Sequence, residues 1–178
     1  MFLGCDLSLT SSGLVVIDDN YNIVKSALLS TPFTGVERLA YLRDRLKEFL
    51  SEYQIKQASI EGGAYHEIGR IYQIGQWAGI VHLFLFDNSI NFIEVAPLQV
   101  KKYVSGKGNK TTKQLVILDV YKNFKEEIRD DNLADAYVLS RIAHDYFYYL
   151  NNQSVDLTEY RKEIILKLYK SYNKHSLL

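Results

Sequence analysis

The sequence predicts an α/β fold: a five-stranded mixed sheet, with three antiparallel strands followed by two parallel ones, flanked by helices. Two observations predict it. The first 30 residues contain three short apolar segments joined by tight polar turns, which is typical of an antiparallel meander. After residue 34, helical and strand patterns alternate along the chain, which is typical of strands joined through helices.

The strands are short apolar segments bounded by turn residues, expected at 2–7, 13–17, 22–30, 57–61 and 92–95. The first segment is apolar on both faces, so it belongs in the centre of the sheet. A polar turn follows it at residues 8–13. Gly62 and Gly63 end the fourth strand.

The helices are expected at about 35–53, 71–86, 97–104, 111–121 and 132–149. In the first, apolar residues recur at alternating spacings of three and four, namely Leu39, Leu42, Leu46, Phe49 and Tyr53. Thr34 to Glu37 fits a capping box that opens this helix. Gly75 and Gly79 lie on one side of the second helix, and they indicate either close packing on the sheet or a helix–helix dimer contact.

The composition favours a globular protein of one domain. The chain has 178 residues, of which 47% are hydrophobic. No apolar run approaches the roughly 20 residues of a membrane span, and the N-terminus lacks the pattern of a signal peptide. Cys5 is the single cysteine, so no internal disulfide can form. We therefore expect a cytoplasmic protein.

Residues 151–178 are expected to form a helical tail packed on the domain of residues 1–150. Apolar residues recur on one face of this tail, at Leu157, Tyr160, Ile164, Leu168 and Tyr172. Basic residues outnumber acidic ones over the same stretch. The tail could instead contact DNA or a protein partner.

Positive charge is concentrated in one segment, although the formal net charge of the chain is zero. Between residues 101 and 125, seven lysines stand against Asp119 alone, a net charge of +6. Such a segment is a candidate surface for phosphate groups.

Two carboxylates end expected strands, Asp6 the first and Glu61 the fourth. A carboxylate in an apolar central strand is costly unless something neutralises it. If these strands are neighbours, their ends lie side by side and the two carboxylates can converge. Two plainer interpretations stay open: Asp6 caps the following turn through backbone N–H groups, and Glu61 is a solvated residue at a strand end.

A third group of acids begins the helix expected at 132–149. Successive helical residues are about 100° apart, so Asp131 lies about 40° from Asp135, and Asn132 lies about 60° to its other side. Asp130 lies about 140° away and points elsewhere. The alternative is a plain helix start, because acids in the first turn complement the helix dipole.

Carboxylates from three elements, without a Cys or His cluster, favour Mg²⁺ or Mn²⁺ over zinc. Together with the lysine-rich segment, they indicate two-metal hydrolysis of a phosphodiester.

Five segments of the chain are similar, in the same order, to the sequence motifs of one protein family. The first motif is usually written G-I-D-P-G with a later T-G, and the second A-I-E. The other three are written L-G-x-A-R-G, E-Y-A-P-x-x-V-K-x-x-V-x-G-x-G and A-x-D-A. The five segments occupy residues 3–13, 58–61, 72–79, 94–108 and 133–137. The chain thereby resembles, over residues 1–148, the RuvC family of Holliday junction resolvases in the RNase H-like superfamily.

The resemblance implies an RNase H-like nuclease domain over residues 1–150. It implies a metal-dependent endonuclease that nicks symmetric strands of four-way (Holliday) junctions and leaves 5′-phosphate and 3′-hydroxyl ends. It also implies a homodimer with one active site for each cut strand. The helix with Gly75 and Gly79 would then form the dimer contact.

The resemblance also implies roles for individual residues. Asp6 would bridge two Mg²⁺ ions, Glu61 would hold one of them, and Asp131 with Asp135 would hold the other. Lys113 would steady the charge on the phosphate. The lysines expected to contact backbone phosphates are Lys101, Lys102, Lys107 and Lys110. Tyr65 would stack on an unpaired base or pack under its loop.

The sequence departs from the family pattern at three places. Leu7 and Ser8 replace the usual Pro-Gly, and Asn132 stands where the family has Asp or His. We expect Asp131 to substitute as the fourth ligand, with Asn132 as the alternative. The segment 61–75 is about one residue shorter than in cellular members. These features favour a bacteriophage resolvase that acts in the host cytoplasm.

Three other functions remain as alternatives. The first motif also resembles the phosphate loop of actin-like sugar kinases, but those chains are far longer and carry a second such motif. A non-catalytic junction-binding protein would explain Asn132. A broader nuclease for forks and flaps would explain the altered segment after Glu61.

Overall fold

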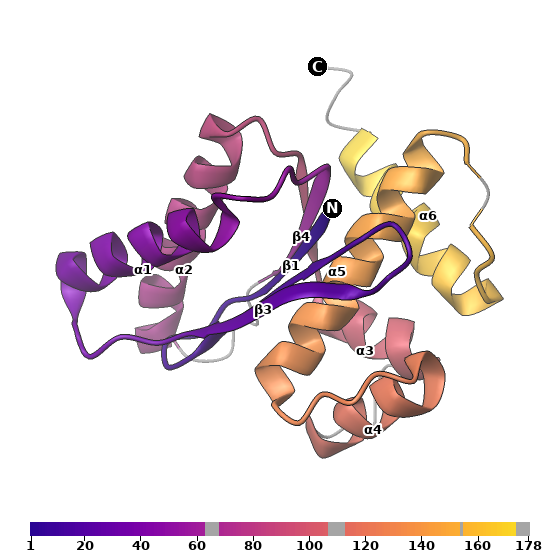
Figure 1. Cartoon of the computed structure of the whole chain (residues 1–178), viewed down its shortest axis with the longest axis horizontal. Coiled ribbons are helices and arrows are strands. Elements are labelled where there is room, and N and C mark those ends of the chain that lie inside the picture. Colours follow the sequence, from indigo (N-terminus) through magenta and orange to yellow (C-terminus); the bar gives the residue numbers. More distant parts are fainter. Residues whose placement is uncertain (63–67, 107–112, 154, 174–178) are drawn as a thin grey trace.

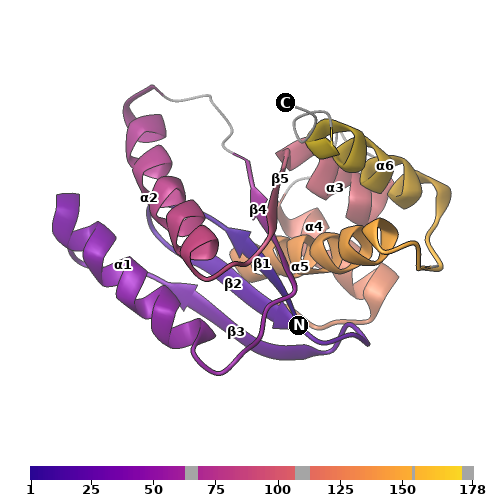
Figure 2. The same cartoon turned by 90° about the horizontal axis from the view of Figure 1, so that it is seen from above.

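A computed structural model of the chain describes residues 1–62, 68–106, 113–153 and 155–173. Its strands form one sheet (Figure 1) in the order β3-β2-β1-β4-β5, which can be followed in Figure 2. Their bounds are β1 Phe2–Asp6, β2 Ser12–Ile17, β3 Ile23–Leu29, β4 Gln57–Glu61 and β5 Phe92–Val95. β1, β2 and β3 pair antiparallel, whereas β4 pairs parallel with both β1 and β5. The predicted five-stranded mixed sheet is confirmed.

The helices lie on both faces of this sheet. Their bounds are α1 Gly35–Leu50, α2 Ile68–Asp87, α3 Pro97–Ser105, α4 Lys113–Phe124, α5 Asp131–Leu150 and α6 Glu159–Asn173. α1 and α2 cover one face, and α5 crosses the other (Figure 2). α3, α4 and α6 surround α5 on that second side.

Each face of the sheet has its own apolar core, and β1 contributes to both. Leu3 and Cys5 belong to the core under α1 and α2, whereas Phe2 belongs to the core under α5. All five residues of β1 are buried. The expectation of a central strand is therefore confirmed, and the strand's last residue is Asp6.

α5 approaches β1 and β2 closely because each strand has a glycine where the helix crosses it. A β-carbon on Gly4 would overlap backbone atoms of Ala136 and Ser140. A β-carbon on Gly13 would overlap the backbone carbonyl of Asn132. Isolated glycines inside strands often mark such approaches of another backbone. They set the first turns of α5 against the carboxyl end of β1.

Several helix ends differ from the sequence-based expectation. Thr34 precedes α1 but its side chain makes no capping hydrogen bond, so the predicted capping box is wrong at this residue. α2 begins at Ile68, three residues earlier than expected. α5 begins at Asp131, because the carboxylate of Asp130 caps it by accepting a hydrogen bond from the backbone N–H of Leu133 at 3.0 Å.

The tail helix α6 packs against α3, α5 and β5. Its residues Ile164, Ile165 and Leu168 are buried in the same core as α5. Its Arg161 donates a hydrogen bond from Nε to the carbonyl of Tyr103 on α3, at 3.1 Å. The division of the chain at residue 150 stays a prediction.

No helix among the described residues is both long enough and apolar enough to cross a membrane.

Candidate active site

Asp6 and Glu61 end neighbouring parallel strands at the same edge of the sheet. Cys5 pairs with Ile60 in the β1–β4 register, and the next residue of each strand is the acid. Cys5 and Ile60 both belong to the core under α1 and α2. Because side chains alternate along a strand, Asp6 and Glu61 are directed to the α5 face.

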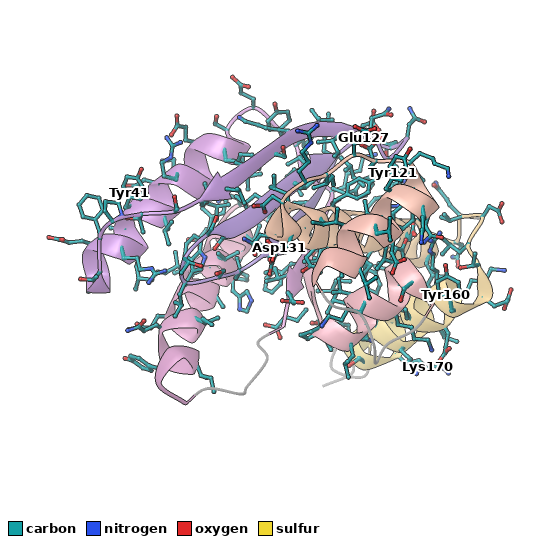
Figure 3. The ribbon with its side chains drawn as sticks, turned by 90° about the horizontal axis from the view of Figure 1, so that it is seen from below. Tyr41, Tyr121, Glu127, Asp131, Tyr160 and Lys170 are labelled. Carbon is teal, nitrogen blue, oxygen red and sulfur yellow. The ribbon has the colours of Figure 1, made fainter. Side chains whose placement is uncertain are left out.

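The start of α5 faces these strand ends. Gly13 is the register partner of Asp6 in the β1–β2 hairpin, and the carbonyl of Asn132 lies directly against Gly13. Asp131 and Asp135 belong to the first two turns of the same helix. Figure 3 shows Asp131 near the centre of the view, at the start of α5. The structure therefore brings the elements carrying all four predicted acids to one edge of the sheet.

The surroundings of Asp6 are tightly packed. Its exposed fraction is only 7%, so its carboxylate is largely removed from solvent. Burial, and then the negative charge of Asp6, raises the pKa of the Cys5 thiol. Cys5 is therefore a neutral packing residue of the core under α1 and α2.

The donor set fits a hard divalent cation by its chemistry. Carboxylate oxygens are the ligands that Mg²⁺ and Mn²⁺ prefer. In the ranges described above, no three Asp, Glu, His or Cys side chains are gathered closely enough to bind a metal ion. Mutual repulsion opposes the gathering of several carboxylates, and a divalent cation offsets that repulsion. The backbone positions of the strand ends and of the start of α5 suit such a site.

A groove of about 400 Å³ lies beside Glu61, between α2 and the ends of β4 and β5. Its walls include Gly75 and Gly79 of α2, and a β-carbon at either glycine would meet nothing within 4 Å. Nε2 of His82 lies 3.2 Å from the carboxylate of Glu94 at the side of this groove.

Lys101 and Lys102 lie side by side in sequence on α3 but differ in their contacts. Lys102 forms an ion pair with Glu163 of α6 at 2.7 Å. Glu163 also pairs with Lys167 at 2.8 Å. Hydrogen bonds from Lys102 and Lys167 lower the pKa of Glu163 to about 2. Lys101 has no ion-pair partner within the described part of the chain.

Four further predicted site residues cannot be located by their side chains. Tyr65, Lys107 and Lys110 lie outside the described residues. Lys113 is the first residue of α4, and the structure describes its backbone alone.

Sequence reasoning missed two features that position the site. The first is the pair Gly4 and Gly13, although single glycines inside apolar strands are the usual signal of a close backbone approach. The second is a hydrogen bond from the indole of Trp77 on α2 to Ser12, at the start of β2. No spacing rule joins residues so far apart in the sequence.

Comparison with known proteins gives a consistent result. A family model described as crossover junction endodeoxyribonuclease RuvC matches residues 2–144. A protein of that name from Aliarcobacter butzleri is 30% identical over 140 residues, which cover 77% of this chain and 82% of that protein. Another from Brachyspira hyodysenteriae is 29% identical over 149 residues, covering 80% and 91% respectively.

The solved structure of Thermus thermophilus RuvC in complex with a Holliday junction substrate has a similar fold. Its TM-score is 0.68 at 22% identity, and the match covers 84% of this chain and 94% of that one. The sheet order and the position of the helices agree with this likeness. The chain belongs to the family of the crossover junction endodeoxyribonuclease RuvC.

Proposed function

We propose that this protein nicks symmetric strands of four-way DNA junctions by metal-dependent hydrolysis, leaving 5′-phosphate and 3′-hydroxyl ends. One observation carries the proposal. Asp6 and Glu61 end adjacent parallel strands on the face that the start of α5 approaches through Gly13. The elements that carry the four acids thereby meet at one edge of the sheet, which supports a shared metal site. The excess of lysine in residues 101–125 supports contact with phosphate.

The four acids would hold the divalent cations, Mg²⁺ or Mn²⁺. Asp6 is central among them, because its strand lies between β2 and β4. Glu61 would act from the β4 side, and Asp131 with Asp135 from α5. Bound cations supply Lewis-acid stabilisation of the phosphate charge and a more acidic attacking water.

The basic residues of α3 and of the start of α4 would hold the DNA. Lys101 and Lys113 would contact phosphate oxygens, with Lys107 and Lys110 adding further contacts from the segment between the helices. Phosphate contacts position the substrate without reading its sequence. Tyr65 would stack on an unpaired base at the crossover.

A homodimer through α2 would place one such site at each of two symmetric strands. The exposed apolar residues Tyr72, Leu83 and Phe86 support it. At about 100° per residue, these three and the two glycines of α2 fall within an arc of about 80° on the helix. Trp77 and Val81 lie on the opposite side and are buried against the sheet.

We further propose that the protein is encoded by a bacteriophage and acts in the host cytoplasm. The replacement of Pro-Gly by Leu7 and Ser8, and the short segment after Glu61, support this origin.

The test is cleavage of a labelled four-way junction with Mg²⁺, beside a fork, a flap and plain duplex. Asp6→Asn should abolish cleavage and preserve junction binding, because removing a negative charge does not weaken attraction to phosphate. The matched control is Asp130→Asn, which also neutralises an acid near α5 but keeps an oxygen that can cap the helix.

Paired nicks on the junction alone, lost only in Asp6→Asn, are the expected result. If forks and flaps are cut as well as the junction, the substrate is branched DNA in general rather than the four-way junction. Tight junction binding without cleavage in either Mg²⁺ or Mn²⁺ would overturn the proposed catalysis.

A further inference from the structure

Trp77 makes a polar contact from the middle of α2 to the hairpin that contains Asp6. Its indole N–H donates a hydrogen bond to the hydroxyl oxygen of Ser12, at 3.1 Å. Both side chains are buried: Trp77 is 1% exposed and Ser12 is 0% exposed. Trp77 is also the single tryptophan of the chain.

Ser12 in turn closes the β1–β2 connection. Its oxygen accepts a hydrogen bond from the backbone N–H of Ser8, and its hydroxyl donates to the Ser8 carbonyl, both at 3.1 Å. The Ser8 side chain also accepts from the backbone N–H of Thr10 at 3.3 Å. These bonds tie the two ends of the turn together.

This turn holds Asp6 from two sides. Asp6 lies two residues before Ser8, where the turn begins, and Ser12 precedes Gly13, the register partner of Asp6. A displacement of Ser12 would therefore shift both the turn and the strand that pairs with Asp6. The hydrogen bond from Trp77 fixes Ser12 to α2, which packs on the face of the sheet opposite to α5.

We propose that Trp77 is a positioning residue for Asp6, acting through Ser12 and the β1–β2 turn. The inference rests on the proposed nuclease function. It also connects α2, the helix assigned to the dimer contact, to the proposed metal site. Coupling between two sites is reciprocal, so cation binding at Asp6 should strengthen the Trp77–Ser12 hydrogen bond.

The first test observes this hydrogen bond directly in the intact protein. A single tryptophan gives a single indole N–H resonance. Its shift and its exchange with solvent can therefore be followed for Trp77 without ambiguity. A titration with Mg²⁺ should shift this resonance and slow its exchange, with the midpoint seen for cleavage. Asp6→Asn should remove the response. An unchanged resonance at Mg²⁺ concentrations that support cleavage would overturn the inference.

The second test uses variants. Trp77→Phe removes the donor and keeps an aromatic ring, and Ser12→Ala removes the acceptor. Each should lower the single-turnover cleavage rate about tenfold, the factor that about 1.4 kcal/mol produces. Each should also raise the Mg²⁺ concentration for half-maximal cleavage, whereas the junction Kd stays unchanged.

Tyr21→Phe is the matched control, because it also removes one side-chain donor, but at the β2–β3 turn. It should leave the Mg²⁺ dependence unchanged. If Trp77→Phe does not fold, Ser12→Ala and the Mg²⁺ titration of the wild type still test the inference. Wild-type Mg²⁺ dependence in folded Trp77→Phe or Ser12→Ala would overturn the inference, whereas absence of cleavage by the wild type would overturn the proposed function instead.

Discussion

The α-carbon of Gly13 lies so close to the carbonyl oxygen of Asn132 that a β-carbon at residue 13 would overlap that oxygen. Gly13 is also the register partner of Asp6. One contact thus fixes the position of the first turn of α5 relative to the strand that ends in Asp6. The distance between Asp6 and the predicted acids of α5 therefore depends on Gly13, which has no side chain.

Gly13→Ala should therefore damage both stability and activity. Forcing an extra carbon into a packed interior costs about 1–3 kcal/mol, and we expect the unfolding free energy to fall by that amount. Cleavage should fall further than the loss of folded protein explains, because α5 moves away from Asp6. Denaturant unfolding and single-turnover cleavage measure the two effects.

The matched control is Gly75→Ala on α2, where a β-carbon would meet nothing within 4 Å. Alanine is preferred over glycine inside a helix by about 1 kcal/mol, so the folded monomer should gain stability. Wild-type stability in Gly13→Ala would show that α5 does not rest on this contact.

A second buried carboxylate, that of Asp145, lies on α5 far from the helix start at Asp131. Asp145 is 0% exposed and accepts hydrogen bonds from the hydroxyl groups of Tyr21, at 2.7 Å, and Tyr103. Nδ1 of His144 lies 2.8 Å from the same carboxylate. Burial, and then the charge of Asp145, raises the pKa of both tyrosines.

Stability should consequently decline as the pH rises above about 10, where an unfolded chain releases its tyrosine protons. The folded protein keeps these protons, so the unfolded state binds fewer protons and the unfolding free energy falls with rising pH. Below that pH the contribution is fully present. Tyr103→Phe should flatten the decline and lower the unfolding free energy at neutral pH by about 1.5–3 kcal/mol.

Denaturant unfolding at a series of pH values measures both effects. Tyr121→Phe is the control, because Tyr121 is half exposed on the surface of α4. The hypothesis fails if Tyr103→Phe and Tyr121→Phe show the same alkaline decline.

Local patterns predicted the fold well. The spacing from Leu39 to Phe49 predicted α1, and the apolar segment before Asp6 predicted the central strand. The prediction that Asp6 and Glu61 converge depends on one topological assumption, that β1 and β4 are neighbours. That assumption is confirmed by the sheet order.

The remaining features depend on contacts between distant residues, which periodicity does not encode. Asp145 lies in an apolar part of α5, and only the fold brings Tyr21 and Tyr103 to it. Likewise, the lysine count of residues 101–125 treated Lys101 and Lys102 alike. The structure distinguishes them, because Lys102 forms an ion pair with Glu163, which is 61 residues away in the sequence.

Lys101→Ala and Lys102→Ala should therefore affect DNA binding differently. The charge of Lys102 is already opposed by Glu163, so its loss should change junction affinity little. Lys101→Ala should weaken binding and reduce the slope of log K against log salt by about 1, as expected for one lost phosphate contact. Fluorescence anisotropy across a salt series measures both quantities.

Glu163→Gln is the complementary variant. It removes the opposing charge from Lys102, so affinity at low salt should rise and the salt slope should steepen. Equal losses of affinity in Lys101→Ala and Lys102→Ala would show that the ion pair opens when DNA binds.

The exposed face of α2 should determine the oligomeric state. Leu83 and Phe86 are 56% and 75% exposed on this face. In a symmetric dimer, Leu83→Glu would bury an unpaired charge from each subunit, at a cost of about 3 kcal/mol or more. That cost weakens the dimer Kd by more than about a hundredfold. Leu115→Glu on α4 is the control, because it adds the same charge at an exposed leucine elsewhere.

Sedimentation equilibrium should find a dimer for the wild type and for Leu115→Glu, and a folded monomer for Leu83→Glu. Each proposed Asp6 site is built from the residues of one chain, so the monomer should still nick one strand at a time. It should lose the coordinated pair of nicks, because the second site no longer arrives with the first. A Leu83→Glu protein that remains dimeric would place the interface away from this face of α2.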